Sequence, residues 1–409
     1  MRTTRLLCVL AAGALLLSAC GDDDSGGHDT GAGLSGDPIK IGQIAPTGTS
    51  FYNSPDSVAV ANAAVRGVNE RGGINGRPLE MVYCNDQVDP NKAADCARKL
   101  VSEGVVAVAR SVVVAGGDQV SAILAEAGIP DVGRGALVPA EFASPNAYLL
   151  DGGVLTAYAG VLQHYADEGG ESVFFAVTES ASGATTLQNL ERMAGEVGLK
   201  VAGTATLPQT TADFAPFVAN IEQSGAQAVL PAFPQQMIQQ TVRAADQSGL
   251  EIDWLLNGGG VTQADLASFP ETQTSHMIVG TGTLPLGAAD ENEAVAQMQD
   301  DIQAQLDAGD EDADPDKLFP NSFIAWEAVN TLATVMTDLD TIDAASITAA
   351  LDKAKDLDVG VSAPWTPSQP GPKNFARVSH PFVHLNEVKD GQLVPLNGGE
   401  PIDVGGLLG

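Results

Sequence analysis

Residues 69–96 of this 409-residue chain read NERGGINGRPLEMVYCNDQVDPNKAADC, and this stretch decides the fold. Apolar residues recur at helical spacing just before it, over residues 54–71. Gly72 and Gly73 then end the helix, because glycine adopts the left-handed conformation at low steric cost. Asn75 and Gly76 favour a tight turn, and Pro78 suits the start of a strand, where no ladder donor is needed. The stretch therefore predicts a helix, a turn and a strand in succession.

The same alternation of short apolar runs with amphipathic stretches continues along most of the chain. The expected strands are Ile39–Ala45, Leu79–Cys84, Val105–Arg110, Val173–Thr178, Ala226–Phe233 and Met277–Gly282. The expected helices are Ser54–Arg71, Pro90–Glu103, Gln119–Ala127, Thr156–Glu168, Thr185–Gly195, Asp213–Gln223, Gln235–Gln247, Glu291–Leu306 and Asn321–Leu339. Apolar strands separated by helices indicate parallel sheets covered on both faces. A chain of about 390 residues after its leader exceeds the size of one core, so we expect an α/β protein with two domains.

The N-terminus has the pattern of an export signal. Arg2 and Arg5 precede an apolar run, Leu6–Leu17, that is too short to span a bilayer as a helix. Leu17-Ser18-Ala19-Cys20 resembles the lipobox of bacterial lipoproteins, which implies a signal peptide over residues 1–19 and a diacylglyceryl group on Cys20. The alternative is an ordinary cleaved signal followed by a chance cysteine. Residues 20–37 are rich in Gly, Asp and Ser without an apolar period, so we expect a flexible tether.

Two cysteines remain outside the leader and its cleavage site. Cys84 and Cys96 would lie in an oxidising compartment, where disulfides persist. We expect them to form a disulfide that closes a short loop; two free buried thiols are the alternative. Because no histidine lies near either cysteine, a metal site is not expected here.

The charge of the chain limits its partners. The formal net charge is −32, which repels nucleic acid and anionic lipid surfaces. Most acidic residues are dispersed, except for the run DAGDEDADPD at Asp307–Asp316. This run lacks the glycine and the distal glutamate of a calcium-binding loop, so we interpret it as a solvated acidic loop.

Several motifs resemble the leucine/isoleucine/valine-binding proteins, which are solute receptors of ABC importers with the type I periplasmic-binding-protein fold. The motifs are Ile41-Gly42 with Pro46-Thr47-Gly48, the block Val68–Leu79, Asn85-Asp86 with Asp89-Pro90, Asp213–Val218, and Val242-Arg243 with Gly249-Leu250. The resemblance runs from Pro38 to the C-terminus. It implies an α/β fold of two doubly wound parallel-sheet lobes joined by a three-segment hinge, with the ligand between them. The implied lobes are residues 38–152 with 286–362, and residues 153–285 with 363–409.

The resemblance also implies which loops contact the ligand. In open α/β sheets, ligands bind beyond the carboxyl ends of the strands. The implied ligand-binding residues are Thr47, Phe51, Tyr52, Val114, Ala115, Gly116, Arg134, Gly135 and Leu137 in the first lobe, and Ser180, Ser182, Phe233, Asn257 and Gly259 in the second. Phe51, Tyr52 and Phe233 are interpreted as wall residues, with a core position as the alternative. The amides of Gly116 and Gly117, at the start of a helix, could cradle an anion.

The chain departs from the family where amino-acid-binding members hold an α-amino acid. Val114-Ala115-Gly116 replaces the serine region, Leu137 the threonine region, and Asn257–Gly260 the acid that receives the ammonium. Burying an unpaired ammonium is costly, so we expect a small, largely apolar organic ligand, with a carboxylic acid or an amino acid as the possibilities. Arg134 is the candidate anchor for a carboxylate, because a guanidinium makes bidentate contacts. The alternative is an arginine that pairs with acidic side chains of this protein.

Catalytic motifs are missing from the sequence. The serines at 180 and 182 do not have the spacing of a nucleophile elbow, and no phosphate-binding loop is present. We therefore expect no enzyme activity, no cofactor and no metal. The expected function is that of a monomeric, extracytoplasmic lipoprotein that captures a ligand by hinge closure and delivers it to ABC permease subunits. The membrane is contacted only through the lipid anchor. A ligand-sensing receptor module of the same fold is the alternative.

Overall fold

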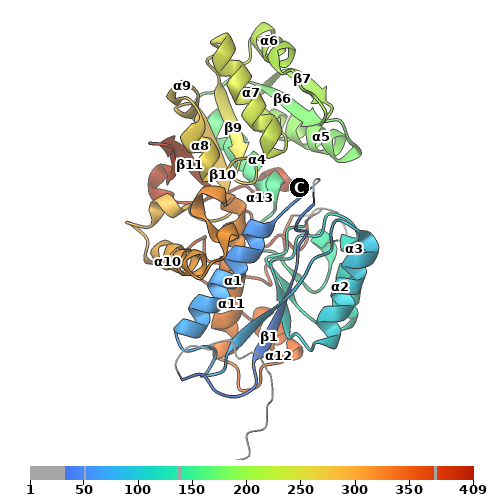
Figure 1. Ribbon diagram of the computed structural model, residues 1–409. Helices are drawn as coiled ribbons and strands as arrows, with labels where there is room; N and C mark the ends of the chain where they lie inside the picture. The colour runs from blue at the N-terminus through green and yellow to red at the C-terminus, as the bar shows by residue number, and fades with distance from the viewer. Residues whose placement is uncertain (1–32, 50–51, 137–140, 373–374) are drawn as a thin grey trace, which may run out of the picture. The chain divides into compact units, whose positions relative to one another are not determined.

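The computed structural model describes residues 33–49, 52–136, 141–372 and 375–409 (Figure 1). The signal peptide, Cys20 and most of the tether predicted above lie outside these residues. The strands are β1 Ile39–Ile44, β2 Leu79–Cys84, β3 Ala107–Ala109, β4 Asp131–Val132, β5 Ala147–Tyr148, β6 Ser172–Thr178, β7 Lys200–Leu207, β8 Ala228–Ala232, β9 Asp253–Asn257, β10 Met277–Thr281, β11 Phe382–Lys389, β12 Gln392–Pro395 and β13 Ile402–Asp403. The helices are α1 Pro55–Glu70, α2 Pro90–Ser102, α3 Gly117–Glu126, α4 Val154–Asp167, α5 Ala181–Glu196, α6 Ala215–Ser224, α7 Gln235–Ser248, α8 Gln263–Ser268, α9 Glu271–Thr274, α10 Glu293–Asp307, α11 Phe323–Thr337, α12 Ala344–Leu351 and α13 Gly405–Leu408.

The first sheet is parallel throughout and has the order β2-β1-β3-β4-β5. Helices α2 and α3 cover one face, and α1 and α11 cover the other (Figure 1). The core on the α1 side combines two distant parts of the chain. It contains Ile41 and Val60 from the N-terminal part together with Trp326 and Trp365 from the C-terminal part. The first lobe is therefore discontinuous in sequence.

The second sheet has the order β12-β11-β10-β9-β8-β6-β7, with β13 paired to β11. Strands β6 to β10 pair in parallel, whereas β11 runs antiparallel to β10. Helices α4, α5 and α13 contribute to the core on one face, and α6, α7 and α8 contribute to the core on the other. Both lobes thus have the doubly wound parallel architecture that the sequence predicts.

The chain passes three times between the two sheets. These passages lie between Tyr148 and Val154, between Thr281 and Glu293, and between Leu351 and Phe382. They are bonded to one another: the amide of Leu284 donates to the carbonyl of Val361 at 2.7 Å. The imidazole of His380 lies 2.9 Å from the carbonyl oxygen of Leu150 and so connects the third passage with the first. The three-segment hinge predicted from the resemblance is present.

The stretch quoted at the start has the predicted conformation. Gly72 and Gly73 both have positive φ after the end of α1, and the amide of Gly73 donates to the carbonyl of Val68 at 2.9 Å. Asn75 and Gly76 also have positive φ, as a type I′ turn requires. An added Cβ at Gly73 would lie 2.2 Å from the carbonyl oxygen of Arg77, so only glycine fits there.

Cys84, at the end of β2, is joined by a disulfide to Cys96 on α2, with 5.5 Å between the two Cα atoms. The closed loop is short, since the sequence separation is 12. In the chain-entropy description, such a loop removes about 3 kcal/mol of conformational freedom from the unfolded chain. Reduction, or the double change Cys84→Ala with Cys96→Ala, should therefore lower the free energy of unfolding by about 2 to 3 kcal/mol in urea titrations. Equal unfolding midpoints with and without reductant would contradict this.

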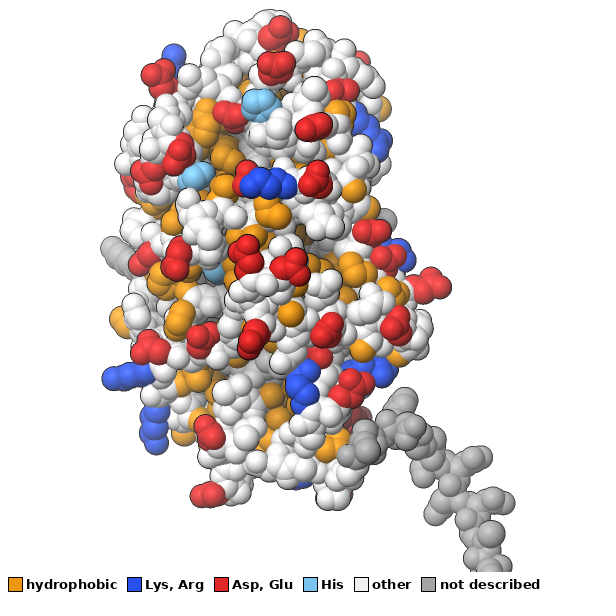
Figure 2. Space-filling view, turned by 90° about the vertical axis from the view of Figure 1, so that its left-hand side faces the viewer, with side chains coloured by type: hydrophobic (Ala, Val, Ile, Leu, Met, Phe, Trp, Pro, Cys, Tyr) orange, Lys and Arg blue, Asp and Glu red, His pale blue; other side chains and the backbone are white. Residues whose placement is uncertain are grey.

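The acidic run at Asp307–Asp316 uses its carboxylates within the chain. Asp310 accepts a hydrogen bond from the amide of Asp312 at 3.2 Å, and Asp314 accepts one from the amide of Asp316 at 3.1 Å. These side chains begin two short 3₁₀ turns, as expected of aspartate before a turn. Acidic side chains are also scattered over the face shown in Figure 2, interspersed with a few lysines and arginines.

Candidate functional site

At the carboxyl edge of the first sheet, hydrogen bonds join the loops in which the sequence analysis places ligand-binding residues. The hydroxyl of Ser111 accepts from the amide of Ile44 at 3.0 Å, and the amide of Val112 donates to the carbonyl of Ile44 at 2.9 Å. Gly135 donates from its amide to the carbonyl of Ser111 at 2.9 Å. The loops after β1, β3 and β4 therefore adjoin, because the strands they follow are parallel neighbours.

The loop after β1 holds Thr47 in place and exposes Tyr52. The hydroxyl of Thr47 lies 2.9 Å from that of Tyr83 and accepts from the side-chain amide of Asn85 at 2.8 Å. Thr47 thus braces the loop. Tyr52 is 42% exposed, although burial of its hydroxyl end raises its pKa. Its ring is available to an incoming molecule. The predicted neighbour Phe51 lies outside the described residues.

The loop after β3 opens onto helix α3. Val114, Ala115 and Gly116 are all half-buried. Gly116 adopts the left-handed conformation as the N-cap of α3, and a Cβ there would lie 2.9 Å from the Cα of Pro90. This loop therefore presents small groups and backbone. A carboxylate already lies over the helix start: a Cβ on Gly117 would be 2.1 Å from Oε1 of Glu141.

Arg134 does not face the cleft, which corrects its prediction as a carboxylate anchor. It is fully buried and binds two acidic side chains, with Nη1 at 2.6 Å from Asp131 and Nε at 2.9 Å from Glu141. Burial opposes its charge, but the two carboxylates outweigh this effect and raise the pKa of Arg134. Arg134 instead pairs with acidic side chains of this protein, which was the alternative, and it does so in the interior. Leu137 lies outside the described residues.

The second lobe contributes two hydroxyl groups and a braced loop. Ser180 caps α5 by accepting from the amide of Gly183 at 2.9 Å, and its hydroxyl lies 3.1 Å from that of Ser182; both serines are exposed. Asn257 is buried, donates to the hydroxyl of Tyr158 at 2.9 Å and accepts from the amide of Gly259 at 2.8 Å. Asn257 therefore shapes its loop, and Gly259 is its exposed tip.

Phe233 belongs to the core, so its interpretation as a wall residue is wrong. It is 5% exposed, and its ring packs edge-on against Phe217 with 5.8 Å between the centroids. The reason is that β8 delivers this side chain to the face covered by α6 and α7. The strand's apolar run simply continues one residue past its end.

Arg110 is a site residue that the sequence analysis missed. It follows β3, has a φ of +46°, and is 7% exposed. Its guanidinium donates to the carbonyls of Gly133 and Asn321, both at 3.1 Å. Within the described part of the chain, its Nε is buried without a hydrogen-bond partner. A positive φ on a residue with a side chain is the strain that functional positions often carry. In the sequence, the signal for this residue is an arginine that directly follows a short apolar strand.

Asn321 is the second missed residue, because it connects the lobes. It lies before α11 on the first-lobe side, and its amide donates to the carbonyl of Gly258 in the loop after β9 at 3.4 Å. An added Cβ would lie 2.9 Å from the Asn321 side chain at both Gly258 and Gly259. The glycine run after β9 is therefore needed for the lobes to approach each other here.

Asp56, close to Tyr52 in the chain, is a buried acid. It is 8% exposed at the start of α1, and burial raises its pKa to about 6, against the opposing effects of the Ser57 and Phe319 amides and the charge of Arg110. The charges of Arg110 and Asp56 act on the pKa of Tyr52 in opposite directions, and burial has the larger effect.

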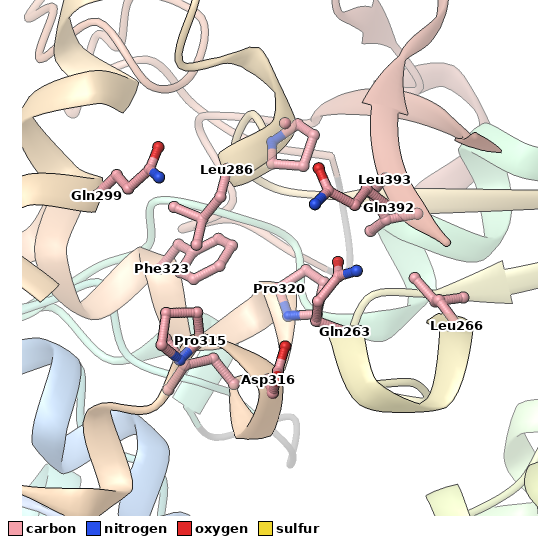
Figure 3. Close-up of a pocket in the computed structure, with 13 residues that line it drawn as sticks. Gln263, Leu266, Leu286, Gln299, Pro315, Asp316, Pro320, Phe323, Gln392 and Leu393 are labelled. Carbon is pink, nitrogen blue, oxygen red and sulfur yellow. The ribbon is translucent and has the colours of Figure 1, made fainter. Parts of the chain in front are cut away.

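A separate hollow of about 170 Å³ is lined by Pro320, which precedes Asn321 in the chain (Figure 3). Its walls come from α8 and β12 on one side and from the segments around α10 and α11 on the other. Its lining residues are Gln263, Leu266, Pro285, Leu286, Gly287, Gln299, Pro315, Asp316, Leu318, Pro320, Phe323, Gln392 and Leu393. It includes none of the ligand-binding residues predicted from the sequence.

The described residues also bear on membrane insertion and metal binding. None of the helices that the structure describes is both long enough and apolar enough to cross a membrane. Over the same residues, no cluster of three or more His, Cys, Asp or Glu is arranged to hold a metal ion.

Comparison with known proteins identifies relatives of this chain. The leucine-, isoleucine-, valine-, threonine- and alanine-binding protein of Pseudomonas aeruginosa is 37% identical over 73 residues, covering 18% of this chain and only 20% of that relative's length. Among solved structures, a fatty acid ABC transporter substrate-binding protein from Thermomonospora curvata matches 92% of this chain and 96% of its own, with a TM-score of 0.71 and 16% identity.

Two further structures match as broadly. A solute-binding protein of an ABC transporter from R. palustris, in complex with 4-hydroxybenzoate, has a TM-score of 0.69 and 18% identity over 90% of this chain and 97% of its own. A substrate-binding periplasmic protein from Ralstonia solanacearum has a TM-score of 0.69 and 18% identity over 88% of this chain and all of its own. These likenesses establish the shared fold. The periplasmic binding protein family model matches residues 38–391, so this chain belongs to that family.

Proposed function

We propose that this protein is an extracytoplasmic solute-binding lipoprotein of an ABC importer. It captures a small, largely apolar organic molecule between its lobes and delivers it to permease subunits. Cys20 carries the lipid anchor, and the lobes comprise residues 38–152 with 286–362 and residues 153–285 with 363–409. The family membership over residues 38–391 carries this proposal. Hinge closure transmits ligand occupancy to the partner, since a ligand shifts a conformational equilibrium through its differential affinity.

The ligand class follows from the side chains at the cleft edge. The second-lobe loop at Asn257–Gly260 contains no carboxylate, so an α-amino acid has no partner there for its ammonium group. The groups available are the ring of Tyr52, the small residues of the loop after β3, and the hydroxyls of Ser180 and Ser182. Such a lining favours an apolar body with few polar atoms. Relatives of this fold include a fatty acid binder and a 4-hydroxybenzoate complex, which supports a monocarboxylic acid.

A thermal-shift panel tests this proposal directly. The panel contains straight-chain fatty acids, 4-hydroxybenzoate and related aromatic acids, and leucine, isoleucine and valine. A ligand at 100 times its Kd should stabilise the native protein by about 2.7 kcal/mol and raise Tm by several degrees. We expect such a rise with an aliphatic or aromatic acid and none with the branched amino acids. Stabilisation by leucine alone would refute the ligand class while leaving solute capture intact.

Tyr52 provides the matched variants for the ligand found. Tyr52→Ala should weaken binding roughly 10-fold, because it removes an apolar wall from the site. Val101→Ala is the control, since Val101 is 38% exposed near the C-terminal end of α2 and is none of the predicted ligand-binding residues. Titration calorimetry of both variants measures the effect. An equal loss of affinity in both variants would show that the wall is elsewhere.

A further inference from the structure

The three passages of the hinge enclose a buried group of polar side chains. We name it the hinge cluster and define it as Arg110, Asp151, Glu327, Ser362 and His380. Asp151 lies in the first passage, and Ser362 and His380 lie in the third. Glu327 projects from α11 in the first lobe. All are buried except Ser362, which is half-buried. The second passage packs on the cluster, because a Cβ on Gly282 would lie 3.3 Å from the Cβ of Asp151.

Glu327 is the least satisfied member of the hinge cluster. It is 1% exposed. Its Oε1 accepts a hydrogen bond from the hydroxyl of Ser362. Its Oε2 is buried, and the described residues offer it no hydrogen-bond partner. An ionised carboxylate in this position would leave charge both buried and incompletely bonded, which is costly. The carboxylic acid form avoids most of that cost.

The charges that face Glu327 come from several elements. Asp151 in the first passage and Asp358 in the third are like charges that disfavour ionisation, whereas Arg110 after β3 favours it. Burial is the largest effect, and together these influences raise the pKa of Glu327 to about 8. The two terminal nitrogens of Arg110 donate to the carbonyls of Gly133 and Asn321, and among the described residues Arg110 makes no ion pair with Glu327.

His380 is the other titratable group in the hinge cluster. Its two ring nitrogens lie 2.9 Å from the carbonyl oxygen of Leu150 and 2.6 Å from that of Ala363. A neutral imidazole has one N–H and can donate to only one of them. Burial lowers the pKa of His380, and these two carbonyls and Asp151 oppose that effect. The packing of the three passages therefore depends on the protonation of both Glu327 and His380.

We propose that the hinge is a proton-linked switch, in which Glu327 holds a proton while the passages are packed as described and releases it when they bend. Bending moves Ser362 and Asp151 relative to α11, which removes the hydroxyl partner and admits water to the carboxyl. The pKa of Glu327 then falls toward its ordinary value of 4.5. Packing of the hinge is fully favoured below about pH 4.5, and this advantage is lost as the pH rises toward about 8. Ligand capture, which rests on the function proposed above, should show the same dependence on pH.

The test uses the ligand-free protein, so it does not depend on the proposed function. Infrared spectroscopy should show a component of the protonated-carboxyl band in wild type that disappears with a midpoint between pH 4.5 and about 8, and this component should be absent from Glu327→Gln. Small-angle X-ray scattering over the same pH range should show the wild-type radius of gyration changing with that midpoint. In Glu327→Gln, which is neutral at every pH, the radius should stay constant.

Glu196→Gln is the matched control, because Glu196 is an exposed acid on α5 in a surface ion pair with Arg192. It should keep both the band and the wild-type scattering profile. A Glu327 carboxyl that titrates at or below its ordinary value of 4.5 would overturn the proposal. So would a band component that titrates between pH 4.5 and about 8 while the radius of gyration does not change. Failure of every ligand in the thermal-shift panel would affect only the proposed function.

Discussion

Replacing Arg134 by methionine should lower the free energy of unfolding by about 3 to 5 kcal/mol, the range seen when one partner of a buried ion pair is removed. Arg134 is 0% exposed and supplies the positive charge between Asp131, at 2.6 Å, and Glu141. Methionine has a similar length but no charge. The variant would keep two acidic side chains in the interior without their shared cation, and each would have to be buried as a carboxylate or take up a proton.

Urea unfolding of wild type and Arg134→Met measures this loss, and its pH dependence identifies the cause. Burial already raises the pKa of Asp131 against the pull of Arg134, so loss of that charge should raise it further. The variant should therefore recover part of its stability as the pH falls and the carboxyls become protonated. Arg98→Met is the control, since Arg98 and Asp95 are 59% and 72% exposed and such pairs contribute little. A loss below 1 kcal/mol would mean that Asp131 and Glu141 rearrange or become hydrated in the variant.

Gly67→Ala should lower the free energy of unfolding by about 3 kcal/mol, at the upper end of the cost of overpacking. Gly67 lies on α1, where an added Cβ would be 2.2 Å from Oδ1 of Asp301 on α10. Asp301 cannot turn away easily. It accepts from Arg71 at 2.7 Å and from the indole of Trp326 at 2.8 Å, and it is 5% exposed. The methyl group would force α1 and α10 apart and break these bonds.

Gly195→Ala is the matched control for that substitution. Gly195 also lies within a helix, α5, and among the described residues nothing would come within 4 Å of its added Cβ. Alanine there should stabilise the protein by about 0.5 to 1 kcal/mol, because it reduces the freedom of the unfolded chain. Thermal unfolding of both variants should therefore shift Tm in opposite directions. Equal shifts would show that contact with Asp301 is not the cause.

The sequence was sufficient for the parts of the fold that repeat a local pattern. The helix, glycine turn and strand around Gly72–Pro78 could be predicted because each residue there has a strong backbone preference. Strands with continuous apolar runs, such as β1, β6 and β10, were also predicted. The edge strand β7 was not, since most of its residues are at least partly exposed and carry no apolar period. The antiparallel strand β11 mixes His, Asn and Glu with apolar residues and was missed for the same reason.

The candidate site was less predictable, because it depends on which way individual side chains turn. Arg134 and Arg110 both follow short strands of one sheet, yet the first turns inward to two acids and the second lies at the sheet edge. Spacing along the chain does not distinguish them. Asn321 contacts Gly258 across the lobes only after both lobes have formed. Long-range contacts of this kind leave no trace in a single sequence.

The division of the first core between two distant parts of the chain has a consequence for biosynthesis. Helices α11 and α12 complete the core that β1 and α1 begin, and they are separated from α1 by the whole run of β6 to β10. A nascent chain that has reached β10 can assemble the contiguous parallel strands of the second lobe, but not the first core. Until Trp326 and Trp365 join them, the apolar faces of β1 and α1 are open to chaperones, or to premature aggregation.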